Sequence, residues 1–363
     1  MKIIESPGHI RPVMEARSAI DIGVVQARLT ATLGAAVKEI RILASGWETT
    51  VFEFTLSTPS IRNREMPVNL PLVLRFYEGT RASEKAKREY PAMCALAGQR
   101  FPVPRPYLLE PLHDALGAPF VVMERVAGGP LFAIKSFPQA FKTFSLGFIG
   151  FVRAQSRLHQ IDPARLDHSA AFKTPQASLL ERMLDLIAKR IDRGPLPGLA
   201  EALARLRDRA TRYPTAPPVP VHLDYHPQNV IVKGLRVTGI IDWVNADRGD
   251  RHLDAATTAV ILASSAMDRP RWMNDNAAGN SLRKLFASLY IPMYHALAPL
   301  ELRRFRYCQA VTALLRLSSF GMMKVRGPEA IGYRPEAIEH VTPAVVRLLS
   351  RYTARKADVP VHI

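Results

Sequence analysis

The spacing of hydrophobic residues changes from a helical to a strand-like pattern near the start of the chain. Residues 20–36 carry apolar side chains three and four positions apart, which predicts an amphipathic helix. Three runs rich in β-branched and aromatic residues follow at 37–43, 49–57 and 71–77, with a turn-like segment between the first two. This pattern predicts a small antiparallel sheet.

A second helix is predicted at 81–98, where Ser83 has the position of an N-cap and Pro91 is expected to kink the helix or reset its first turn. A stretch punctuated by prolines at 101–111 leads into an apolar strand at 119–126. The strand-like runs therefore end near residue 126.

Beyond this point helical spacing dominates, apart from one β-type island at 219–243 whose two short strands flank a turn at Lys233 and Gly234. The change predicts two lobes, an N-terminal lobe at 1–125 and a mostly helical lobe at 126–363. The helical segments predicted in the second lobe are 145–161, 178–191, 199–213 and several between 252 and 355.

The composition is that of a globular protein, because 48% of the 363 residues are hydrophobic and 22% are charged. Cys94 and Cys308 belong to no CxxC or Cys/His cluster, which favours a reducing compartment over a disulfide framework or structural zinc. The first residues lack the apolar run of a signal peptide, and no apolar stretch reaches the roughly 18 residues of a membrane helix. We expect a cytoplasmic protein without a membrane partner.

The chain is strongly basic, with a formal net charge of +17. Such an excess attracts nucleic acid, acidic membranes or anionic metabolites, and an arginine-rich solvated surface is the alternative. No nucleic-acid recognition motif accompanies the charge, so a nucleic-acid partner is not expected.

Chemistry-bearing residues are concentrated in the β-type island. Asp224 and Asn229 share a loop with His222, and Asp242 follows the second strand of the hairpin, which folds back toward that loop. An acid, an amide and a second acid would converge there. Phosphoryl transfer needs a carboxylate to position and deprotonate a hydroxyl and an Asn/Asp pair to hold Mg²⁺.

These residues carry a family resemblance. The segment HLDYHPQN at 222–229, followed by IIDW at 240–243, resembles the catalytic loop and metal-binding segment of the aminoglycoside phosphotransferase and choline kinase-like family. Segments at 71–77, 87–98, 103–106, 117–131 and 156–162 are similar to other parts of that family in the expected order. The resemblance implies an α+β, two-lobed protein-kinase-like fold and ATP-dependent phosphorylation of a small-molecule hydroxyl.

The resemblance also implies a role for each matching residue. Asp224 would be the catalytic base or the carboxylate that orients the substrate, Asn229 and Asp242 would be the magnesium ligands, and His222 would brace the loop by hydrogen bonds. Nucleotide binding would fall to Arg75 paired with Glu89, to the turn from Ser45 through Gly46 to Thr49, and to the backbone from Glu124 to Val126.

Three positions depart from the family pattern. Arg75 stands where many kinases have Lys, and its planar fork binds phosphate with a different geometry. Gln228 stands where HPGN-like loops have Gly, and the turn that would cover the phosphates has one glycine, Gly46.

Four alternatives remain for the same residues. The HxDxH pattern of His222, Asp224 and His226 has the spacing of a transition-metal site, which would suggest a metallohydrolase. A second alternative is a kinase-like binding module that is catalytically inactive. For Glu89 alone, the alternative is an i,i+4 ion pair with Lys85 on the same helix. A protein kinase is disfavoured, because the chain has no DFG and no APE motif.

The acceptor is predicted from the charge of residues 252–355, which contain many arginines and few clustered carboxylates. Polycationic antibiotics are best bound by clustered Asp and Glu. We therefore expect a neutral or anionic metabolite or natural product, with an aminoglycoside as the alternative.

Overall fold

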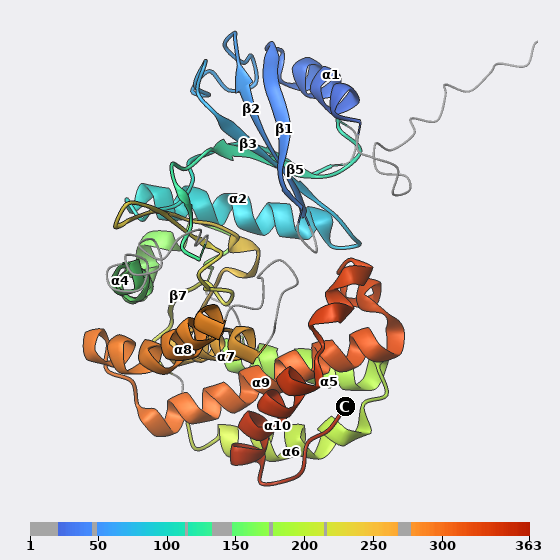
Figure 1. The fold of residues 1–363 in the computed structure, drawn as a ribbon, viewed down its shortest axis with the longest axis vertical. Helices are drawn as coiled ribbons and strands as arrows, with labels where there is room; N and C mark the ends of the chain where they lie inside the picture. The colour runs from blue at the N-terminus through green and yellow to red at the C-terminus, as the bar shows by residue number, and fades with distance from the viewer. Residues whose placement is uncertain are drawn as a thin grey trace, which may run out of the picture. The chain divides into compact units, whose positions relative to one another are not determined.

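The computed structural model describes residues 21–45, 49–112, 115–132, 147–173, 177–213, 216–267 and 277–363 (Figure 1). Contacts divide the chain into two compact units. The first consists of Met1–Lys87 and Arg105–Arg125, and the second of Arg88–Pro104 and Val126–Ile363. The second unit thus includes residues 88–104, which the hydrophobic pattern assigned to the N-terminal lobe.

A five-stranded antiparallel sheet forms the framework of the first unit, with the strand order β1-β2-β3-β5-β4. Helix α1 (Ile22–Leu33) begins at Asp21, whose carboxylate accepts hydrogen bonds from the first backbone N–H groups, and ends at Gly34 in the left-handed conformation. The strands are β1 (Val37–Ser45), β2 (Thr49–Leu56), β3 (Leu72–Tyr77), β4 (Pro106–Glu110) and β5 (Phe120–Glu124).

The core of this unit combines α1 with alternate residues of the sheet. Phe76 is 2% exposed, and its ring meets those of Phe52 and Phe120 edge-on at centroid distances of 5.3 and 6.0 Å. The period-two alternation of the strands therefore places these aromatic rings on one face.

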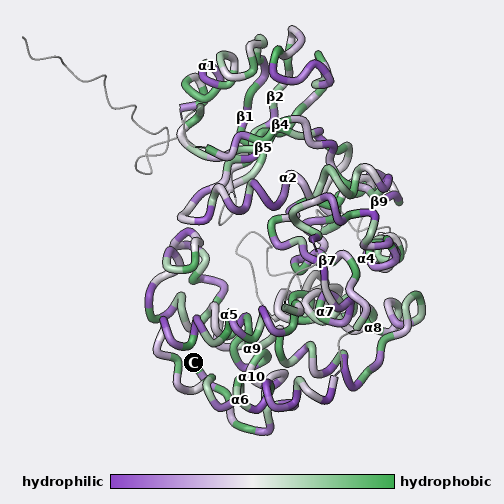
Figure 2. Tube along the Cα trace, turned by 180° about the vertical axis from the view of Figure 1, so that it is seen from behind, coloured by the Kyte–Doolittle hydropathy of each residue, from purple (hydrophilic) through white to green (hydrophobic). Residues whose placement is uncertain are grey.

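Helices dominate the second unit, and two short sheets complete it. Figure 2 shows hydrophobic and hydrophilic positions alternating along the helices, as expected when one face packs on a core. The longer helices are α4 (Phe148–Leu158), α5 (Leu179–Arg193), α6 (Pro197–Ala210), α7 (Arg251–Met267), α8 (Ala277–Leu297), α9 (Leu302–Arg326) and α10 (Pro343–Ala357).

The two short sheets frame the predicted island. Strands β8 (Val230–Lys233) and β9 (Arg236–Ile240) form the predicted hairpin, and β6 (Gly129–Pro130) pairs with β8. Strand β7 (Val219–Val221) pairs with β10 (Asp247–Gly249). Short 3₁₀ helices connect these elements at Pro163–Leu166, Trp243–Asn245, Pro328–Ile331 and Pro335–His340.

The start of helix α2 and the strand β4 differ from what the sequence predicts. Helix α2 (Ala82–Gly98) is assigned as one helix through Pro91 and begins before Ser83, whose hydroxyl donates to the carbonyl of Pro111. Ser83 is therefore not the expected N-cap. The strand β4 lies in the proline-rich stretch and was not predicted; Pro106 occupies its first position, where a missing N–H is tolerated.

Within the described ranges, no helix combines the length and the apolar character needed to cross a bilayer.

The aromatic cluster of the first unit gives a stability prediction. Phe76→Ala removes a buried ring from two edge-on contacts and leaves a cavity, so we expect it to lower the free energy of unfolding by about 3–5 kcal/mol. Leu70→Ala is the control, because Leu70 is 58% exposed and should change the stability by less than about 0.5 kcal/mol. Urea unfolding followed by circular dichroism measures both, and equal losses would contradict the assignment of Phe76 to the core.

Candidate functional site

The loop between β7 and β8 brings Asp224 and Asn229 into contact. The side-chain amide Nδ2 of Asn229 donates to the backbone carbonyl of Asp224 at 3.0 Å and lies 3.5 Å from Oδ2 of its carboxylate. The Asp224 side chain is 31% exposed, and Asn229 is buried. The loop therefore presents one solvent-accessible carboxylate on a rigid support.

The β8–β9 hairpin returns the chain to the same loop at Ile241. The Ile241 N–H donates to the carbonyl of Asn229 at 2.9 Å, and the Ile241 carbonyl accepts from His222 Nε2 at 3.0 Å. Asp242 is the next residue along the chain. The hairpin thus links the segment that carries Asp242 to both ends of the loop.

His222 has a defined protonation state. Its Nδ1 accepts the backbone N–H of Asp224 at 3.2 Å while Nε2 donates to Ile241, which requires the neutral tautomer with the proton on Nε2. Burial lowers the pKa of His222, although the nearby Asp254 and Asp224 carboxylates act in the opposite direction. His222 is therefore a neutral hydrogen-bonding residue of the loop.

Asp242 has a left-handed backbone conformation, with φ 69° and ψ 61°. The next N–H, that of Trp243, donates to the buried carboxylate of Glu89 at 3.1 Å, and the Trp243 indole donates to the carbonyl of Ile240 at 2.8 Å. These bonds fix the backbone on the carboxyl side of Asp242. Glu89, expected as the partner of Arg75, thus contacts the segment predicted to bind metal.

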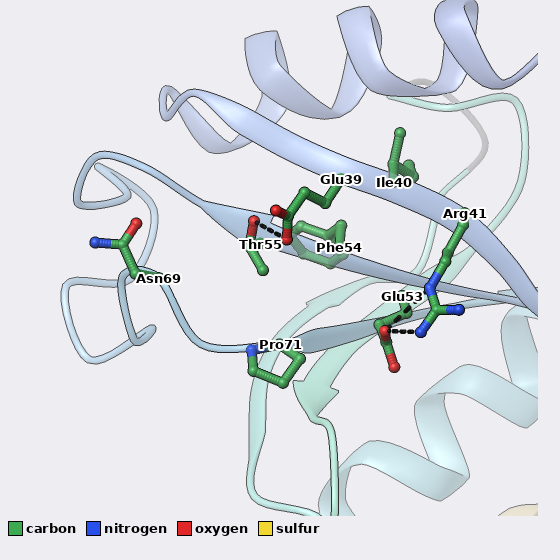
Figure 3. A pocket seen from close by; sticks show the side chains of 8 residues that line it. All are labelled: Glu39, Ile40, Arg41, Glu53, Phe54, Thr55, Asn69 and Pro71. Atoms are coloured by element: carbon green, nitrogen blue, oxygen red, sulfur yellow. Dashed lines mark hydrogen bonds and ion pairs between the residues drawn. The ribbon is translucent and has the colours of Figure 1, made fainter.

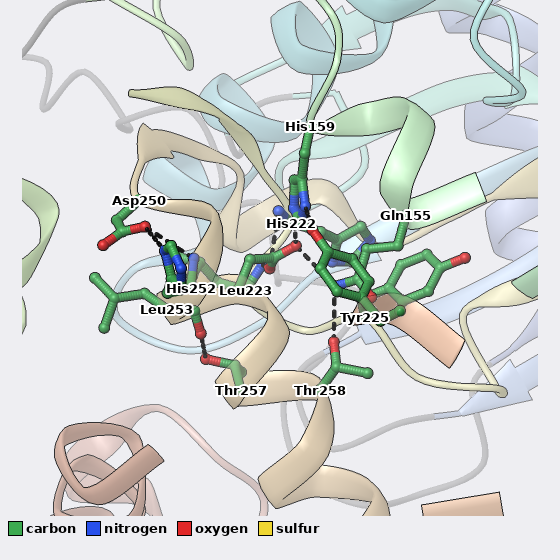
Figure 4. A network of polar contacts seen from close by, with 12 residues as sticks. Gln155, His159, His222, Leu223, Tyr225, Asp250, His252, Leu253, Thr257 and Thr258 are labelled. Atoms are coloured by element: carbon green, nitrogen blue, oxygen red, sulfur yellow. Dashed lines mark hydrogen bonds and ion pairs between the residues drawn. The ribbon is translucent and has the colours of Figure 1, made fainter. Parts of the chain in front are cut away.

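Asp254, a residue not selected from the sequence, supports the loop from α7. Its Oδ1 accepts the backbone N–H groups of His222 at 3.2 Å and Leu223 at 2.6 Å. Its Oδ2 accepts from Gln155 Nε2 at 2.9 Å and from His159 Nε2 at 2.8 Å (Figure 4). Leu223 has a positive φ of 60°, a costly conformation for a residue with a side chain, and its N–H bond to Asp254 is the shorter of the two.

The electrostatics of Asp254 follow from these contacts. Burial alone raises the pKa of a carboxyl, but the hydrogen bond and charge interaction with His159, together with Gln155, lower the pKa of Asp254 below its ordinary value. The available signal in the sequence was one acidic residue inside the apolar run at 253–263. A buried acid in such a run is expected to be hydrogen-bonded.

The predicted nucleotide residues of the first unit lie on β1, β2 and β3. Arg75 is 7% exposed, opposite Val51 and Val121 in the sheet, and its guanidinium lies 5.4 Å from the centre of the Tyr77 ring. Thr49 is buried at the start of β2. Ser45 ends β1, and Gly46 lies outside the described residues.

The predicted hinge extends from the end of β5. The backbone N–H of Glu124 donates to the carbonyl of Arg105 at 2.8 Å, and that of Arg125 donates to the carbonyl of Pro71 at 3.3 Å. Both donors are therefore engaged within the first unit. Val126 is buried and belongs to the second unit.

The HxDxH hypothesis is wrong. Both ring nitrogens of His222 make hydrogen bonds, and His226 Nδ1 accepts the N–H of Gln228 at 3.3 Å. Among the residues that the structure describes, no three His, Cys, Asp or Glu side chains are grouped to hold a metal ion.

Asn229 and Asp242 supply a different donor set. Because Asn229 directs its NH₂ group to Asp224, its amide oxygen lies on the other side of the group. An amide oxygen and a carboxylate are the ligands that Mg²⁺ prefers when substrate phosphates and water complete its coordination. The chemistry of these two side chains is therefore that of ligands for a magnesium ion.

A separate pocket of about 590 Å³ lies on the first unit between β1, β2 and the segment before β3 (Figure 3). Its main charged group, Glu53, is already bound by Arg41 at 2.5 Å and Arg125 at 2.8 Å. None of the predicted site residues lines it. We therefore assign it no part in the chemistry.

Comparison with known families matches residues 39–300 to the phosphotransferase enzyme family. Comparison with curated protein sequences gives no match. The family match covers the loop, the hairpin and Asp254 together.

Solved structures share the fold. A thermostable mutant of aminoglycoside phosphotransferase APH(4)-Ia without ligand has a TM-score of 0.60 and 16% identity, covering 89% of this chain and 99% of its own. Another mutant, in a ternary complex with ADP and hygromycin B, has a TM-score of 0.58 and 16% identity, with coverage of 89% and 98%. Macrolide 2'-phosphotransferase MphH from Brachybacterium faecium has a TM-score of 0.52 and 15% identity, covering 89% and 98%. The expected α+β kinase-like fold is confirmed.

The lowered pKa of Asp254 predicts how stability depends on pH. A carboxyl whose pKa is lower in the folded state contributes stability above its unfolded pKa of about 3.9, and this contribution is lost as the pH falls toward the folded value. We expect Asp254→Asn to cost about 3 kcal/mol at pH 7 and to weaken the loss of stability below pH 4 relative to wild type.

Urea unfolding between pH 3 and pH 7 measures this difference. Asp185→Asn is the control, because Asp185 forms an exposed pair with Arg207 and should change stability little at any pH. An unchanged acid slope in Asp254→Asn would show that Asp254 is not ionised in the folded protein.

Proposed function

Since the chain belongs to the phosphotransferase enzyme family, we propose that it is an ATP-dependent, Mg²⁺-requiring kinase that phosphorylates a hydroxyl group of a neutral or anionic small molecule. The observation that carries this proposal is the contact of Asn229 with Asp224 beside the hairpin that returns Asp242 to the same loop. One exposed carboxylate and an Asn/Asp pair are the groups that phosphoryl transfer requires.

Asp224 is the residue proposed to act on the acceptor. Its carboxylate is accessible, so it can accept a hydrogen bond from the acceptor hydroxyl and take its proton as the oxygen bonds to the γ-phosphorus. The bond between that phosphorus and the ADP oxygen breaks in the same transfer. Asn229 holds the backbone carbonyl of Asp224 through its amide, which fixes the position from which the carboxylate extends.

Asn229 and Asp242 are proposed to hold Mg²⁺, which neutralises charge on the phosphate oxygens when it is bound. His222 and Glu89 keep these two residues in place, His222 through Ile241 and Glu89 through the N–H of Trp243. Both contacts belong to the second unit, which supports a metal site assembled within that unit.

The nucleotide is proposed to contact residues 1–125 as well. Arg75 would bind phosphate oxygens with its charged fork, and the turn that joins Ser45 to Thr49 would cover them. Because the N–H groups of Glu124 and Arg125 are engaged within the sheet, we propose that the adenine is held through backbone carbonyl groups of the segment from Glu124 to Val126. The ADP bound in the similar hygromycin complex supports a nucleotide site in this fold.

The acceptor proposal rests on the engagement of nearby carboxylates. Asp247 is bound by both guanidinium nitrogens of Arg182 at 2.6 and 2.9 Å. Asp250 contacts Arg304 at 2.6 Å and His252 at 2.7 Å, and Asp254 is buried. These acids are committed to the protein, which supports an acceptor without multiple amines. We place the reaction in the cytoplasm, where ATP is supplied.

Two substitutions separate the proposed roles. Asp224→Asn should abolish phosphoryl transfer while leaving the affinity for MgATP within a few fold, because the lost group acts on the acceptor hydroxyl. Asp242→Ala should weaken MgATP binding itself, because a metal ligand is gone. Transfer of label from γ-³²P-ATP to a panel of hydroxyl compounds measures the first effect, and calorimetry with and without Mg²⁺ measures the second.

Wild-type turnover in Asp224→Asn would refute the role of Asp224 in acting on the acceptor hydroxyl. Unchanged magnesium-dependent ATP binding in Asp242→Ala would refute the assignment of Asp242 as a magnesium ligand. Wild-type protein that binds MgATP but phosphorylates none of a broad panel would favour an inactive binding module.

The committed carboxylates also predict the acceptor class. A polycationic aminoglycoside would lose solvation and gain few acidic partners, so we expect kanamycin to give no phosphorylation above background. Neutral and acidic alcohols in the same labelled-ATP panel should include the substrates. A kcat/KM for kanamycin above about 10⁴ M⁻¹s⁻¹, as for an enzyme with its own substrate, would overturn this prediction.

A further inference from the structure

Two tyrosines of α8 contact the donors that hold Asp254. Tyr290 and Tyr294 are one helical turn apart, both are 0% exposed, and their ring centroids are 5.9 Å apart. Burial raises the pKa of both hydroxyls above the ordinary value of tyrosine, so each carries its proton at neutral pH. A buried hydroxyl that carries its proton can form a hydrogen bond with a neighbouring polar side chain.

Each tyrosine orients one donor of the Asp254 carboxylate. The Tyr290 hydroxyl donates to Gln155 Oε1 at 2.5 Å, which directs the amide Nε2 of Gln155 to Asp254 Oδ2 and Thr258. The Tyr294 hydroxyl lies 2.5 Å from His159 Nδ1, and His159 Nε2 lies 2.8 Å from the same Asp254 oxygen. Two parallel chains of hydrogen bonds therefore run from α8 to one carboxylate.

The second oxygen of the Asp254 carboxylate, Oδ1, contacts the backbone of the loop that carries Asp224. Among the residues that the structure describes, Oδ2 accepts from Gln155 and His159, whereas Oδ1 accepts from the N–H groups of His222 and Leu223. Fixing Oδ2 therefore fixes the direction of Oδ1. That direction maintains Leu223 in its positive-φ conformation, one residue before Asp224.

Helix α8 contains a proline between the two tyrosines. Pro292 lies inside the helix and cannot donate a hydrogen bond to the carbonyl of Ser288. A change in the course of α8 at this point would alter one chain of hydrogen bonds relative to the other.

We propose that Tyr290 and Tyr294 are positioning residues, whose hydroxyl groups set the orientation of Asp224 through Gln155, His159 and Asp254. This proposal rests on the proposed role of Asp224 in phosphoryl transfer. It makes the turnover rate depend on two hydroxyl groups of α8 that act on the loop through Gln155, His159 and Asp254.

The test uses the full-length protein with the double substitution Tyr290→Phe and Tyr294→Phe, which keeps both rings and removes both hydroxyls. Tyr307→Phe is the matched control, because Tyr307 is also 0% exposed and its hydroxyl donates to the carbonyl of Leu206 at 2.8 Å, outside this network. Hydrogen–deuterium exchange followed by mass spectrometry reports on the loop peptide 219–226, and labelled-ATP assays give kcat and KM for ATP.

We expect exchange in the loop peptide to be at least about fivefold faster in the double variant than in Tyr307→Phe. We expect its kcat to fall on the order of tenfold or more, with KM for ATP within twofold of wild type. Adding Asp254→Asn to the double variant should then cost less than it does in wild type, because the same chain is already broken.

Equal exchange of the loop peptide in the double variant and in Tyr307→Phe would overturn the proposal, and so would an unchanged kcat. A failure of the proposed function looks different. In that case wild-type protein transfers no label, or Asp224→Asn stays active, while exchange still reports whether the tyrosines hold the loop.

Discussion

The buried carboxylate of Asp254 holds the backbone of the loop that carries Asp224. A charge without solvent is costly unless donors surround it, and four donors do so here. Two of them are consecutive N–H groups of the loop, at His222 and Leu223. The hydrogen bonds that compensate this buried charge therefore also hold the backbone of the candidate site.

The site also depends on two residues in left-handed conformations, Leu223 and Asp242. Each conformation costs roughly 1–2 kcal/mol for a residue with a side chain, so it persists only where neighbouring contacts determine it. Asp254 does this for Leu223, and Glu89 fixes the N–H after Asp242. Ile241 joins the two segments, since it bonds to Asn229 through its N–H and to His222 through its carbonyl.

Both units have an apolar core, and the second unit adds the network of buried polar contacts around the site. The sheet buries aromatic rings against α1, and Arg75 is carried by β3 at a position between neighbouring strands on both sides. The strand fixes the backbone of Arg75, and the neighbouring Tyr77 ring limits the movement of its guanidinium group. A cation held in this way has lost much of its conformational freedom before any phosphate binds.

The sequence alone determined the helices, the hairpin with its Lys233–Gly234 turn, and the loop spacing that joins Asp224 to Asn229. These features depend on hydrophobic period and turn chemistry within a few residues, which a single sequence displays. Tertiary structure decided the rest. Asp254 reaches Leu223 across 31 positions, and Glu89 reaches Trp243 across 154. No local pattern in the sequence encodes such pairs, because the tertiary structure decides which distant residue lies beside a buried polar group.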